Sequence, residues 1–433
     1  MKSDAQDIFR AALRAVDPFE CVRRHAGRVE ARLREERCGR LAVVAFGKAA
    51  CAMTRGLLES LPGCDAPGIV VTKYGHASGT VLPERIAVFE AGHPVPDENG
   101  VSATVRAVDL ARSAGADTLV TCLVSGGGSA LLAAPCEGVT LGEKQEMTRL
   151  LLDAGADIVE LNTVRKHVSR VKGGRLAEDA APAGVMSLIL SDVIGDRLDS
   201  IASGPTAPDE TTYGEALRVL ERYRLAGRVP GSVLRTLERG ALGEIPETPK
   251  PGSPLFERVE NVIVGSNRLA LEAAQEKARE MGYEVVVLTS ELRGEARDAA
   301  RLLAGKAREA RSGRTGGGRP LCLISGGETT VTVRGNGTGG RNTELALAFA
   351  LEIEGLDGIT LLSAGTDGTD GPTDAAGAFA DGNTAVEARR AGLDPEAFLG
   401  NNDSYHFFKK AGGLLVTGPT GTNVMDIQIL LLR

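Results

Sequence analysis

Two amphipathic helices are predicted at the start of the chain. Hydrophobic residues recur at intervals of three and four over the first 16 positions, which is the spacing of one helix face: Ile8, Ala12, Leu13 and Val16. This pattern ends near Pro18, and a second helical run continues to about Arg37. The chain therefore opens with two helices rather than with a strand.

From Leu41 onward, short hydrophobic runs alternate with amphipathic ones. We predict strands at LAVVAF (41–46), GIVVTK (68–73), RIAVFE (85–90) and TLVTCLV (118–124), with helices between them. Such alternation is typical of a parallel sheet with crossover helices. The loops GKAA, GHPVPDENG and SGGGSAL then follow strand ends, and open α/β sheets bind ligands at the carboxyl ends of their strands.

A second α/β alternation follows a segment rich in Pro and Gly. Strands are predicted at NVIVGSN, YEVVVLTS, LCLISGG, TTVTV and ITLLSAG, with GLLVTG and VMDIQILLL as a C-terminal pair and a loop at 312–320. GEIPETPKPGSP has the composition of a stiff linker. We therefore predict a two-domain α/β protein. Residues 1–245 form a Rossmann-like domain with a mostly parallel sheet and flanking helices, 246–258 form a linker, and 259–433 form a second α/β domain.

Composition narrows the class of protein. The chain has 433 residues, 42% hydrophobic and 25% charged, as globular proteins have, which excludes disordered and fibrous classes. A net charge of −7, the lack of a dense basic run and 3% aromatic residues argue against nucleic-acid binding. No run reaches about 18 apolar residues and the start lacks a signal-peptide core. The seven cysteines contain no CxxC pair. We expect a cytoplasmic protein without membrane partners, and the sequence leaves homo-oligomerisation open.

A glycine turn after the strand 118–124 is the first candidate binding site. Backbone N–H groups exposed by small residues at a helix start bind phosphate or carboxylate, and the turn comprises Ser125, Gly126, Gly127, Gly128 and Ser129. The alternative is a tight turn without a ligand. Lys48 also stands between a strand and a helix, where its ammonium could reach a phosphate as a point charge.

Two further clusters of charge occur before the linker. A basic run could bind an acid or be a solvated helix face, and it contains Arg165, Lys166, His167, Arg170, Lys172 and Arg175. Three carboxylates then follow an apolar strand: Asp192, Asp196 and Asp199. Carboxylates at a strand end suit Mg²⁺ or the deprotonation of a substrate hydroxyl, and helix capping is the alternative for Asp192 and Asp196.

The second half contains a literal GxGxxG at Gly335, Gly337 and Gly340. A dinucleotide site needs an acidic residue at the tip of the next strand, but Asp357 precedes that strand and Asp367 comes late. The sequence favours instead a phosphate loop made of Gly337, Gly339, Gly340, Arg341 and Asn342. Downstream, Asp367, Asp370 and Asp374 stand in a glycine-rich loop, where a metal or ribose role competes with a plain acidic turn. There is no Walker A sequence.

Several long motifs, taken in order, carry a family resemblance. VSGGGSALL, NTVRKHVSRVKGGRLA, SDVIGDRLDSIASGPTAPD, ISGGETTVTVRGNGTGGRN, SAGTDGTDGPTDAAGA and the closing GLLVTGPTGTNVMDIQILLL together resemble the class II glycerate 2-kinases. The resemblance covers essentially the whole chain. It implies a Rossmann-like region followed by a MOFRL-type domain, with local departures in GTNVMDIQILLL.

The resemblance implies ATP-dependent phosphorylation of D-glycerate at its 2-hydroxyl, with Mg²⁺ or another divalent cation, in a cleft between the two domains. It also implies that Lys48 and Arg341 are catalytic or contact phosphate. We assign proton acceptance or metal binding to Asp192, metal or nucleotide to Asp367, an anionic part of the reactants to 125–129, and the acid carboxylate to Arg165, Lys166 or Arg175.

Two other functions remain as alternatives. Some relatives carry the label of hydroxypyruvate reductase, and a nicotinamide-dependent reductase would use the literal GxGxxG. A non-catalytic sensor of sugar acids or nucleotides would bind glycerate without consuming ATP, and the acidic loops at two strand ends argue against it.

Overall fold

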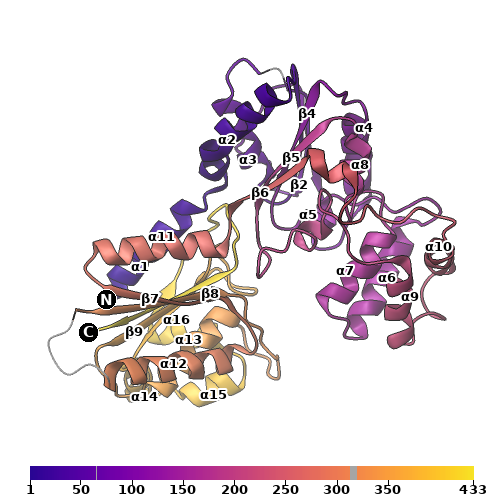
Figure 1. The fold of residues 1–433 in the computed structure, drawn as a ribbon. Coiled ribbons are helices and arrows are strands. Elements are labelled where there is room, and N and C mark those ends of the chain that lie inside the picture. The colour runs from indigo at the N-terminus through magenta and orange to yellow at the C-terminus, as the bar shows by residue number, and fades with distance from the viewer. Residues whose placement is uncertain (65, 313–318) are drawn as a thin grey trace. The chain divides into compact units, whose positions relative to one another are not determined.

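The computed structural model describes residues 1–64, 66–312 and 319–433 (Figure 1). The chain divides into two compact units. The larger unit comprises Pro18–Ser191 and Asp196–Val264, and the smaller unit comprises Met1–Asp17, Asp192–Gly195 and Gly265–Arg433. The two-domain α/β class predicted from the sequence is confirmed.

The larger unit is built on a six-stranded sheet of order β3-β2-β1-β4-β5-β6. Its strands are β1 (Arg40–Phe46), β2 (Gly68–Lys73), β3 (Ile86–Ala91), β4 (Thr118–Val124), β5 (Gly184–Leu190) and β6 (Val259–Gly265). Strands β1 to β5 pair in parallel. Every residue of β4 and β5 is buried, as in parallel sheets covered on both faces. The carboxyl ends of β1 and β4 are therefore neighbours.

Helices precede the first strand or connect the strands of this sheet. They are α2 (Pro18–Glu35), α3 (Ala50–Ser60), α4 (Glu98–Arg112), α5 (Gly128–Leu131) and α8 (Arg175–Ala180). A separate helical cluster contains α6 (Leu141–Asp153), α7 (Ile158–His167), α9 (Tyr213–Arg222) and α10 (Gly231–Ala241). These four helices share one hydrophobic core that includes Met147, Val164 and Tyr213. The core fixes α7, which carries the first three residues of the basic run, Arg165, Lys166 and His167.

The smaller unit has a second six-stranded sheet, of order β11-β10-β9-β12-β8-β7. Its strands are β7 (Glu284–Leu292), β8 (Leu321–Gly327), β9 (Ile359–Gly365), β10 (Gly377–Asp381), β11 (Leu414–Leu415) and β12 (Asp426–Leu432). Only β7 and β8 pair in parallel among these described strands, and the other pairs are antiparallel. The second α/β domain is thus a mixed sheet.

Helices cover this second sheet on both faces (Figure 1). On one side lie α1 (Lys2–Ala15) and α11 (Asn267–Glu280), which pack against each other. On the other side lie α12 (Ala296–Ser312), α13 (Arg341–Glu352), α14 (Thr384–Arg390), α15 (Pro395–Gly400) and α16 (Ser404–Ala411). The core between sheet and helices is rich in alanine and leucine, with Phe349, Phe407 and Phe408 as its largest side chains.

The units differ from the predicted domain boundaries at both ends of the larger unit. The first helix packs through Ile8 and Phe9 into the smaller unit, because its hydrophobic face meets α11, β9 and β12. Strand β6, predicted to open the second domain, extends the first sheet. The segment 246–258, predicted as a linker, is held on the larger unit by the Thr248 hydroxyl, which donates to Asp209, and ends in a 3₁₀-helix, Pro254–Arg258.

Three local expectations for the second half were wrong. TTVTV forms no strand, because only Thr330 makes a bridge, to Glu295. GLLVTG and VMDIQILLL do not pair with each other: β11 pairs with β10, and β12 lies between β8 and β9. Strand β10 was missed because its sequence, GAFAD, has no long hydrophobic run. Most of the predicted loop at 312–320 lies outside the described residues.

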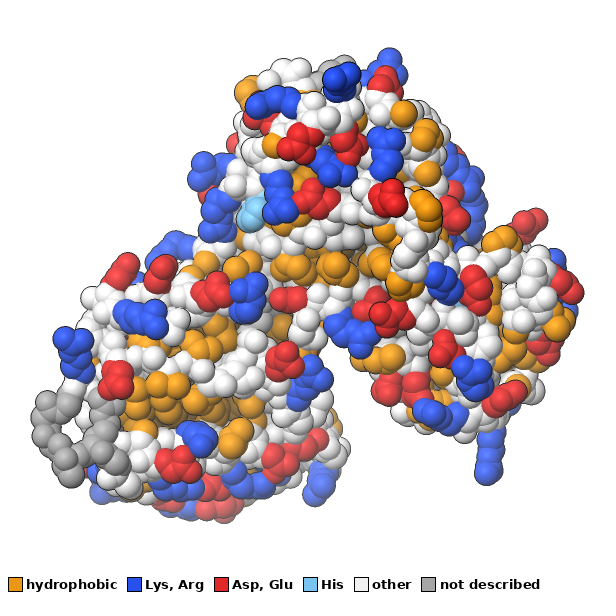
Figure 2. All heavy atoms as spheres, viewed as in Figure 1, with side chains coloured by type: hydrophobic (Ala, Val, Ile, Leu, Met, Phe, Trp, Pro, Cys, Tyr) orange, Lys and Arg blue, Asp and Glu red, His pale blue; other side chains and the backbone are white. Residues whose placement is uncertain are grey.

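Other sequence expectations concern the surface and the cysteines. All seven cysteines carry free thiols. Among the described helices, none combines the length and hydropathy that a membrane span requires. Acidic and basic side chains are interspersed over the visible surface (Figure 2). Hydrophobic side chains are also open to solvent on edge strand β7, where Val286 and Val287 are 43% and 37% exposed.

Replacing Gly240 with Ala should destabilise the helical cluster. A Cβ atom at this position would collide with the buried ring of Tyr213. Overpacking of this kind costs about 1–3 kcal/mol, so we expect a lower midpoint in thermal unfolding. Gly142→Ala, on α6, is the matched control because its Cβ would meet open space, and it should be neutral or slightly stabilising. Equal midpoints for the two variants would contradict this packing account.

Candidate functional site

Lys48 stands at the junction of β1 and α3, held there by the neighbouring glycine turn. Its backbone N–H donates to the carbonyl of Gly126 at 2.9 Å, and the N–H of Ala49 donates to Ser125 Oγ at 3.1 Å. Gly47 has φ +123°, and a Cβ there would collide with Ser125. Only glycine permits this approach. The ammonium group of Lys48 makes no hydrogen bond or ion pair within the described part of the chain, which leaves it available to a ligand.

The turn 125–129 approaches a histidine as well as Lys48. Gly127 adopts φ +83°, and a Cβ there would lie 2.9 Å from the ring of His93 and 3.5 Å from Lys48 Cγ. Helix α5, which follows, has only four residues, so its dipole adds little to anion binding. Lys48 and His93 therefore both lie beside the backbone of Gly127.

His93 is a neutral imidazole at physiological pH. Burial, together with the positive charges of Lys48 and Lys73, lowers its pKa to about 4. A neutral ring beside a lysine can donate or accept a hydrogen bond without adding charge. The sequence placed a ligand loop at GHPVPDENG but gave His93 no role.

The other side of the turn is bound by a buried lysine. Lys172 Nζ donates to the carbonyl oxygen of Ser129 at 2.8 Å and to its Oγ at 3.0 Å. Ser129 and Ser203 hydroxyls lie 2.8 Å apart, and Ser203 donates to Asn162 Oδ1 at 3.1 Å. Because Ser203 uses its proton on Asn162, Ser129 is the donor to Ser203. A directed chain of hydrogen bonds thus fixes Ser129 to α7.

The backbone next to this chain is strained. Ala202 and Ser203 have φ of +50° and +62°, in the left-handed region that side chains disfavour. Such residues cost on the order of 1 kcal/mol or more each and cluster at binding sites. The segment SIASGP (200–205) therefore places the Ser203 hydroxyl at the cost of backbone strain.

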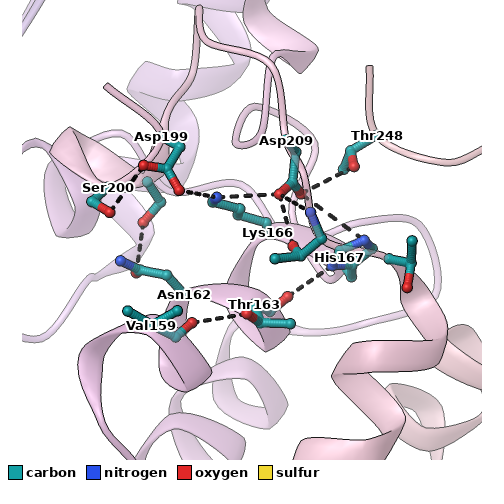
Figure 3. Close-up of polar contacts among 12 residues, drawn as sticks. Val159, Asn162, Thr163, Lys166, His167, Asp199, Ser200, Asp209 and Thr248 are labelled. Atoms are coloured by element: carbon teal, nitrogen blue, oxygen red, sulfur yellow. Dashed lines mark hydrogen bonds and ion pairs between the residues drawn. The ribbon is translucent and has the colours of Figure 1, made fainter. Parts of the chain in front are cut away.

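Lys166, predicted to bind the acid, belongs to a buried ion-pair network (Figure 3). Its ammonium lies 3.2 Å from Asp209 and 3.5 Å from Asp199. Although burial disfavours charge on Asp209, Lys166 and the hydrogen bonds of Thr211 hold the pKa of that carboxyl below its usual range. Two carboxylates already neutralise Lys166, so the geometry argues against its binding a substrate acid.

His167 extends the same network toward the segment 246–250. Its Nε2 lies 3.2 Å from Glu247, and its Nδ1 lies 2.7 Å from the carbonyl of Thr163. Burial works against charge on Glu247, but hydrogen bonds from His167, the Tyr213 N–H and Lys250 lower its pKa to about 2. This network is structural, because it ties α7 to the end of the larger unit's chain.

Arg175 and Arg165 are used differently. The guanidinium of Arg175 donates to the carbonyls of Lys166 and Ser169 and to the Tyr213 hydroxyl, so it stabilises the turn after α7. Arg165 makes no ion pair or hydrogen bond through its guanidinium with any described residue, and burial lowers its pKa. Of the three predicted carboxylate binders, the geometry leaves Arg165.

Asp192 lies directly after β5, two residues beyond its last buried leucine. It is partly exposed and engages in interactions with neighbouring residues. This places a carboxylate at the carboxyl end of a central strand, the edge at which α/β sheets bind ligands. Its role in proton acceptance or metal binding stays a prediction.

Arg341 opens α13 in the smaller unit, where carboxylates surround it. Its guanidinium forms a bidentate ion pair with Asp426, with N···O distances of 2.6 and 3.0 Å, and donates to Glu328 at 2.6 Å. Burial disfavours its charge, but Asp426 and Glu328 outweigh that effect and raise its pKa. Three of its five N–H donors are used and its side chain is 34% exposed, so donors remain for a ligand.

In the predicted phosphate loop before α13, the protein itself accepts hydrogen bonds from several of the backbone N–H groups. The N–H groups of Gly335 and Gly337 donate to Asn402 and Asn401, and that of Gly340 donates to Thr343. At the helix start, Asp370 accepts from the N–H groups of Asn342 and Thr343 at 2.9 and 2.8 Å. A carboxylate of the protein thus occupies the helix N-terminus. Gly339 packs against the Ser404 hydroxyl.

Asn342 is likewise engaged inside the protein. Its side-chain amide donates to Asp426 at 3.0 Å and accepts from the Ser363 hydroxyl at 2.7 Å. The sequence assigned Asn342 to phosphate binding and left Asp370 open between a metal or ribose role and an acidic turn. The structure uses both to hold Arg341 and Asp426 in place.

Asp367 lies near the Arg341 group. Burial raises the pKa of Glu328, and Arg341 lowers it. The negative charges of Asp426 and Asp367 also raise the pKa of Glu328, so the three carboxylates lie close enough to interact electrostatically. Asp367 Oδ1 accepts from the N–H and hydroxyl of Thr369. Among the described residues, no group of three His, Cys, Asp or Glu is arranged around a common metal position. Mg²⁺ often takes only one or two carboxylates plus phosphate oxygens, so a partly exposed Asp367 in a net negative surrounding fits that mode.

Three residues with a place in this site were missed from the sequence as binding groups: His93, Lys144 and Lys172. Lys172 was noted only within a basic run. Lys144 occupies a buried position on α6, where a heptad-like pattern would expect a hydrophobic side chain. A lysine on the apolar face of an amphipathic helix is a signal that the sequence contained.

Comparison with known proteins supplies independent evidence. Residues 4–238 match a family described as a domain of unknown function, DUF4147, and residues 321–426 match the MOFRL family. The D-glycerate 2-kinase of Thermotoga maritima is 45% identical over 429 residues, which is 99% of this chain and 98% of the relative. A protein of Agrobacterium vitis, provisionally named hydroxypyruvate reductase, is 42% identical over 98% of this chain and 93% of its own.

A solved structure also matches over its full length. The crystal structure of a glycerate kinase from Thermotoga maritima superposes with a TM-score of 0.90 at 45% sequence identity, covering 100% of this chain and 99% of that chain. The family resemblance drawn from the sequence motifs is therefore confirmed: the chain belongs to the glycerate 2-kinase family.

Proposed function

We propose that this protein transfers the terminal phosphoryl group of ATP to the 2-hydroxyl of D-glycerate, giving 2-phospho-D-glycerate and ADP. One observation carries the proposal: in a chain that aligns end to end with a D-glycerate 2-kinase, Lys48 presents an unpaired ammonium beside a glycine turn. Kinases of this kind need a positioned cation more than a covalent group, because phosphoryl transfer depends on orientation and charge neutralisation.

In this mechanism Lys48 stabilises the negative charge of the phosphoryl group as it moves. Gly126 and Ser125 fix the backbone of Lys48, so little free energy is spent on repositioning this residue when the transition state forms. Arg341, with its remaining N–H donors, neutralises phosphate oxygens. Asp192 accepts the proton of the 2-hydroxyl as the oxygen attacks phosphorus. Neutral His93 holds a reactant oxygen by a hydrogen bond without repelling Lys48.

A divalent cation such as Mg²⁺ would neutralise part of the phosphate charge when bound. Asp367 fits as its protein ligand, since it is partly exposed and stands near two other carboxylates. Asp192 is the second candidate from the sequence. Arg341 limits the role of Asp426, whose two oxygens already accept from it.

The reductase alternative receives less support. A nicotinamide fingerprint needs glycine N–H groups directed at a pyrophosphate, whereas those of Gly335 and Gly337 are used by the segment 401–402. Asp370 also fills the start of α13 with negative charge, which would repel a pyrophosphate there. Oxidation of NADH on addition of hydroxypyruvate would favour the reductase. A sensor without catalysis would bind glycerate and leave ATP intact.

The reaction is tested by identifying its product. With ATP, Mg²⁺ and D-glycerate, we expect a product that enolase converts to phosphoenolpyruvate directly, because only the 2-phosphate is an enolase substrate. Product detected solely after addition of a phosphoglycerate mutase would mean phosphorylation at the 3-hydroxyl. No nucleotide consumption with D-glycerate would reject the kinase proposal altogether.

Lys48→Ala should lower kcat by about a hundredfold or more, equivalent to roughly 2.7 kcal/mol of barrier, because the transferring charge loses its cation. Steady-state assays with both substrates saturating measure the effect. Lys306→Ala, on the exposed part of α12, serves as the control and should keep normal turnover. Near-normal turnover of the Lys48 variant would remove this residue from the mechanism.

Metal removal should abolish turnover, and Asp367→Asn should raise the Mg²⁺ concentration needed for half-maximal rate by about tenfold, since one charged ligand is lost. The measurement is a Mg²⁺ titration after chelation. Asp374→Asn is the matched control, because Asp374 stands in the same loop but pairs with the Tyr405 hydroxyl. An unchanged titration for Asp367→Asn would exclude this residue as a ligand.

A further inference from the structure

A buried lysine without a partner lies in the helical cluster of the larger unit. Lys144 is 5% exposed and sits on the inner face of α6 with Leu141 and Met147. Its Nζ is fully buried and makes no hydrogen bond with any described residue. Burial lowers the pKa of Lys144 to about 8, and the charge of Arg165 lowers it in the same direction. An ammonium in this position is expensive unless something neutralises it.

Two more cations stand close to Lys144. Lys172, 1% exposed, donates to Ser129 and to the carbonyl of Ala202, so its hydrogen-bond partners among the described residues are uncharged. Burial lowers the pKa of Lys172 well below its usual value, and the charges of Lys144 and Arg165 contribute. Arg165 has no hydrogen-bonding or ion-pair partner within the described residues. Lys144, Lys172 and Arg165 are thus three cations of which none is paired with a carboxylate of the described residues.

The nearby acids are committed elsewhere. Asp199 and Asp209 pair with Lys166, and Glu160 pairs with Arg222. A fold that gains only from packing would place a hydrophobic residue at position 144, because replacing a buried charge by an apolar side chain is often stabilising. The arrangement is explained if a negatively charged ligand completes it.

We propose that Lys144 and Arg165 bind the carboxylate of the acceptor acid, and that Lys172, whose three N–H donors go to Ser129 and Ala202, adds positive charge to the same subsite. This inference rests on the proposed function and names the group that holds the substrate. Ser129, bound by Lys172, belongs to the same turn as Gly127, which lies beside Lys48. In a 2-hydroxy acid the carboxyl carbon is bonded to the carbon that bears the reacting hydroxyl. Ser129 lies two residues after Gly127 in this turn, so a carboxylate held near Ser129 suits that geometry.

The chemistry of the three groups favours a carboxylate over a polyphosphate. A guanidinium offers a planar pair of donors that matches a planar carboxylate. Lys144 and Lys172 are buried and Arg165 is partly buried, which suits a small acid better than a nucleotide that must stay partly open to solvent. Its donors are side chains rather than a row of backbone N–H groups, which is the usual phosphate cradle.

The test uses Lys144→Met, which keeps the length of the side chain and removes its charge. We expect the KM for D-glycerate to rise at least tenfold, with the KM for ATP unchanged and a thermal midpoint equal to or above that of the unaltered protein. Arg149→Met, an exposed position on the same helix, is the control and should keep both KM values. Arg165→Gln provides a second variant should Lys144→Met fail to fold.

Binding without catalysis separates this inference from the kinase proposal. Calorimetric titration of the full-length protein with D-glycerate in the presence of ADP should show binding that weakens at least tenfold in Lys144→Met, while glycerol, which lacks the carboxylate, should not bind. If the protein consumes no ATP but this pattern holds, the subsite stands and the kinase reaction fails. A raised KM for ATP with normal D-glycerate binding would assign the cations to phosphate and overturn the proposal. Unchanged constants in both variants, or no acid binding by the unaltered protein, would overturn it as well.

Discussion

The contact between Gly47 and Ser125 is the constraint on which the larger unit's site depends. Strands β1 and β4 are parallel neighbours, so the loops that leave their carboxyl ends meet. They meet closely enough that the N–H of Lys48 bonds to Gly126 and that of Ala49 to Ser125, which a side chain at position 47 would prevent. One loop thereby fixes a lysine and the other supplies small residues with exposed backbone. The sheet's register, rather than any single side chain, sets this arrangement.

The cations of the chain divide by whether a carboxylate of the protein already neutralises them. Lys166 and Arg341 have such partners at short distance, and Arg175 is bound to carbonyls and a tyrosine. Lys48, Lys144 and Arg165 have none within the described residues. A carboxylate partner compensates the charge of a cation, although Arg341 keeps two N–H donors beyond its pairs, whereas an unpaired cation in a partly or fully buried place carries an uncompensated charge. This distinction separates neighbours such as Arg165 and Lys166, which the sequence could only treat together.

The sequence predicted the periodic elements well because their burial repeats along the chain. Both opening helices and the strands at 41–46, 68–73 and 118–124 follow from hydrophobic spacing alone. Strand β10 was missed because a buried run of Gly and Ala carries little hydrophobic signal. The affiliation of α1 with the smaller unit could not be predicted, since it depends on contacts with residues more than 250 positions away. Candidate residues such as Lys48 could be named, but the partners that decide their roles come from distant segments.

The GxGxxG of the smaller unit shows why a glycine motif does not by itself identify a ligand. Glycine is needed wherever two backbones come close, and at Gly335, Gly337 and Gly340 the approaching groups are Asn401, Asp403 and Asp370 of the same chain. These neighbours also accept hydrogen bonds from backbone N–H groups to which a phosphate could otherwise bind. The carboxylate of Asp370 at the start of α13 takes the place of an external anion and holds Thr343 and Asn342. That internal cap fixes the first turn of the helix, and with it the backbone from which Arg341 extends to Asp426 and Glu328. The motif therefore positions an arginine in this unit, and its glycines allow the loop to pack closely against the segment 401–403 and Asp370.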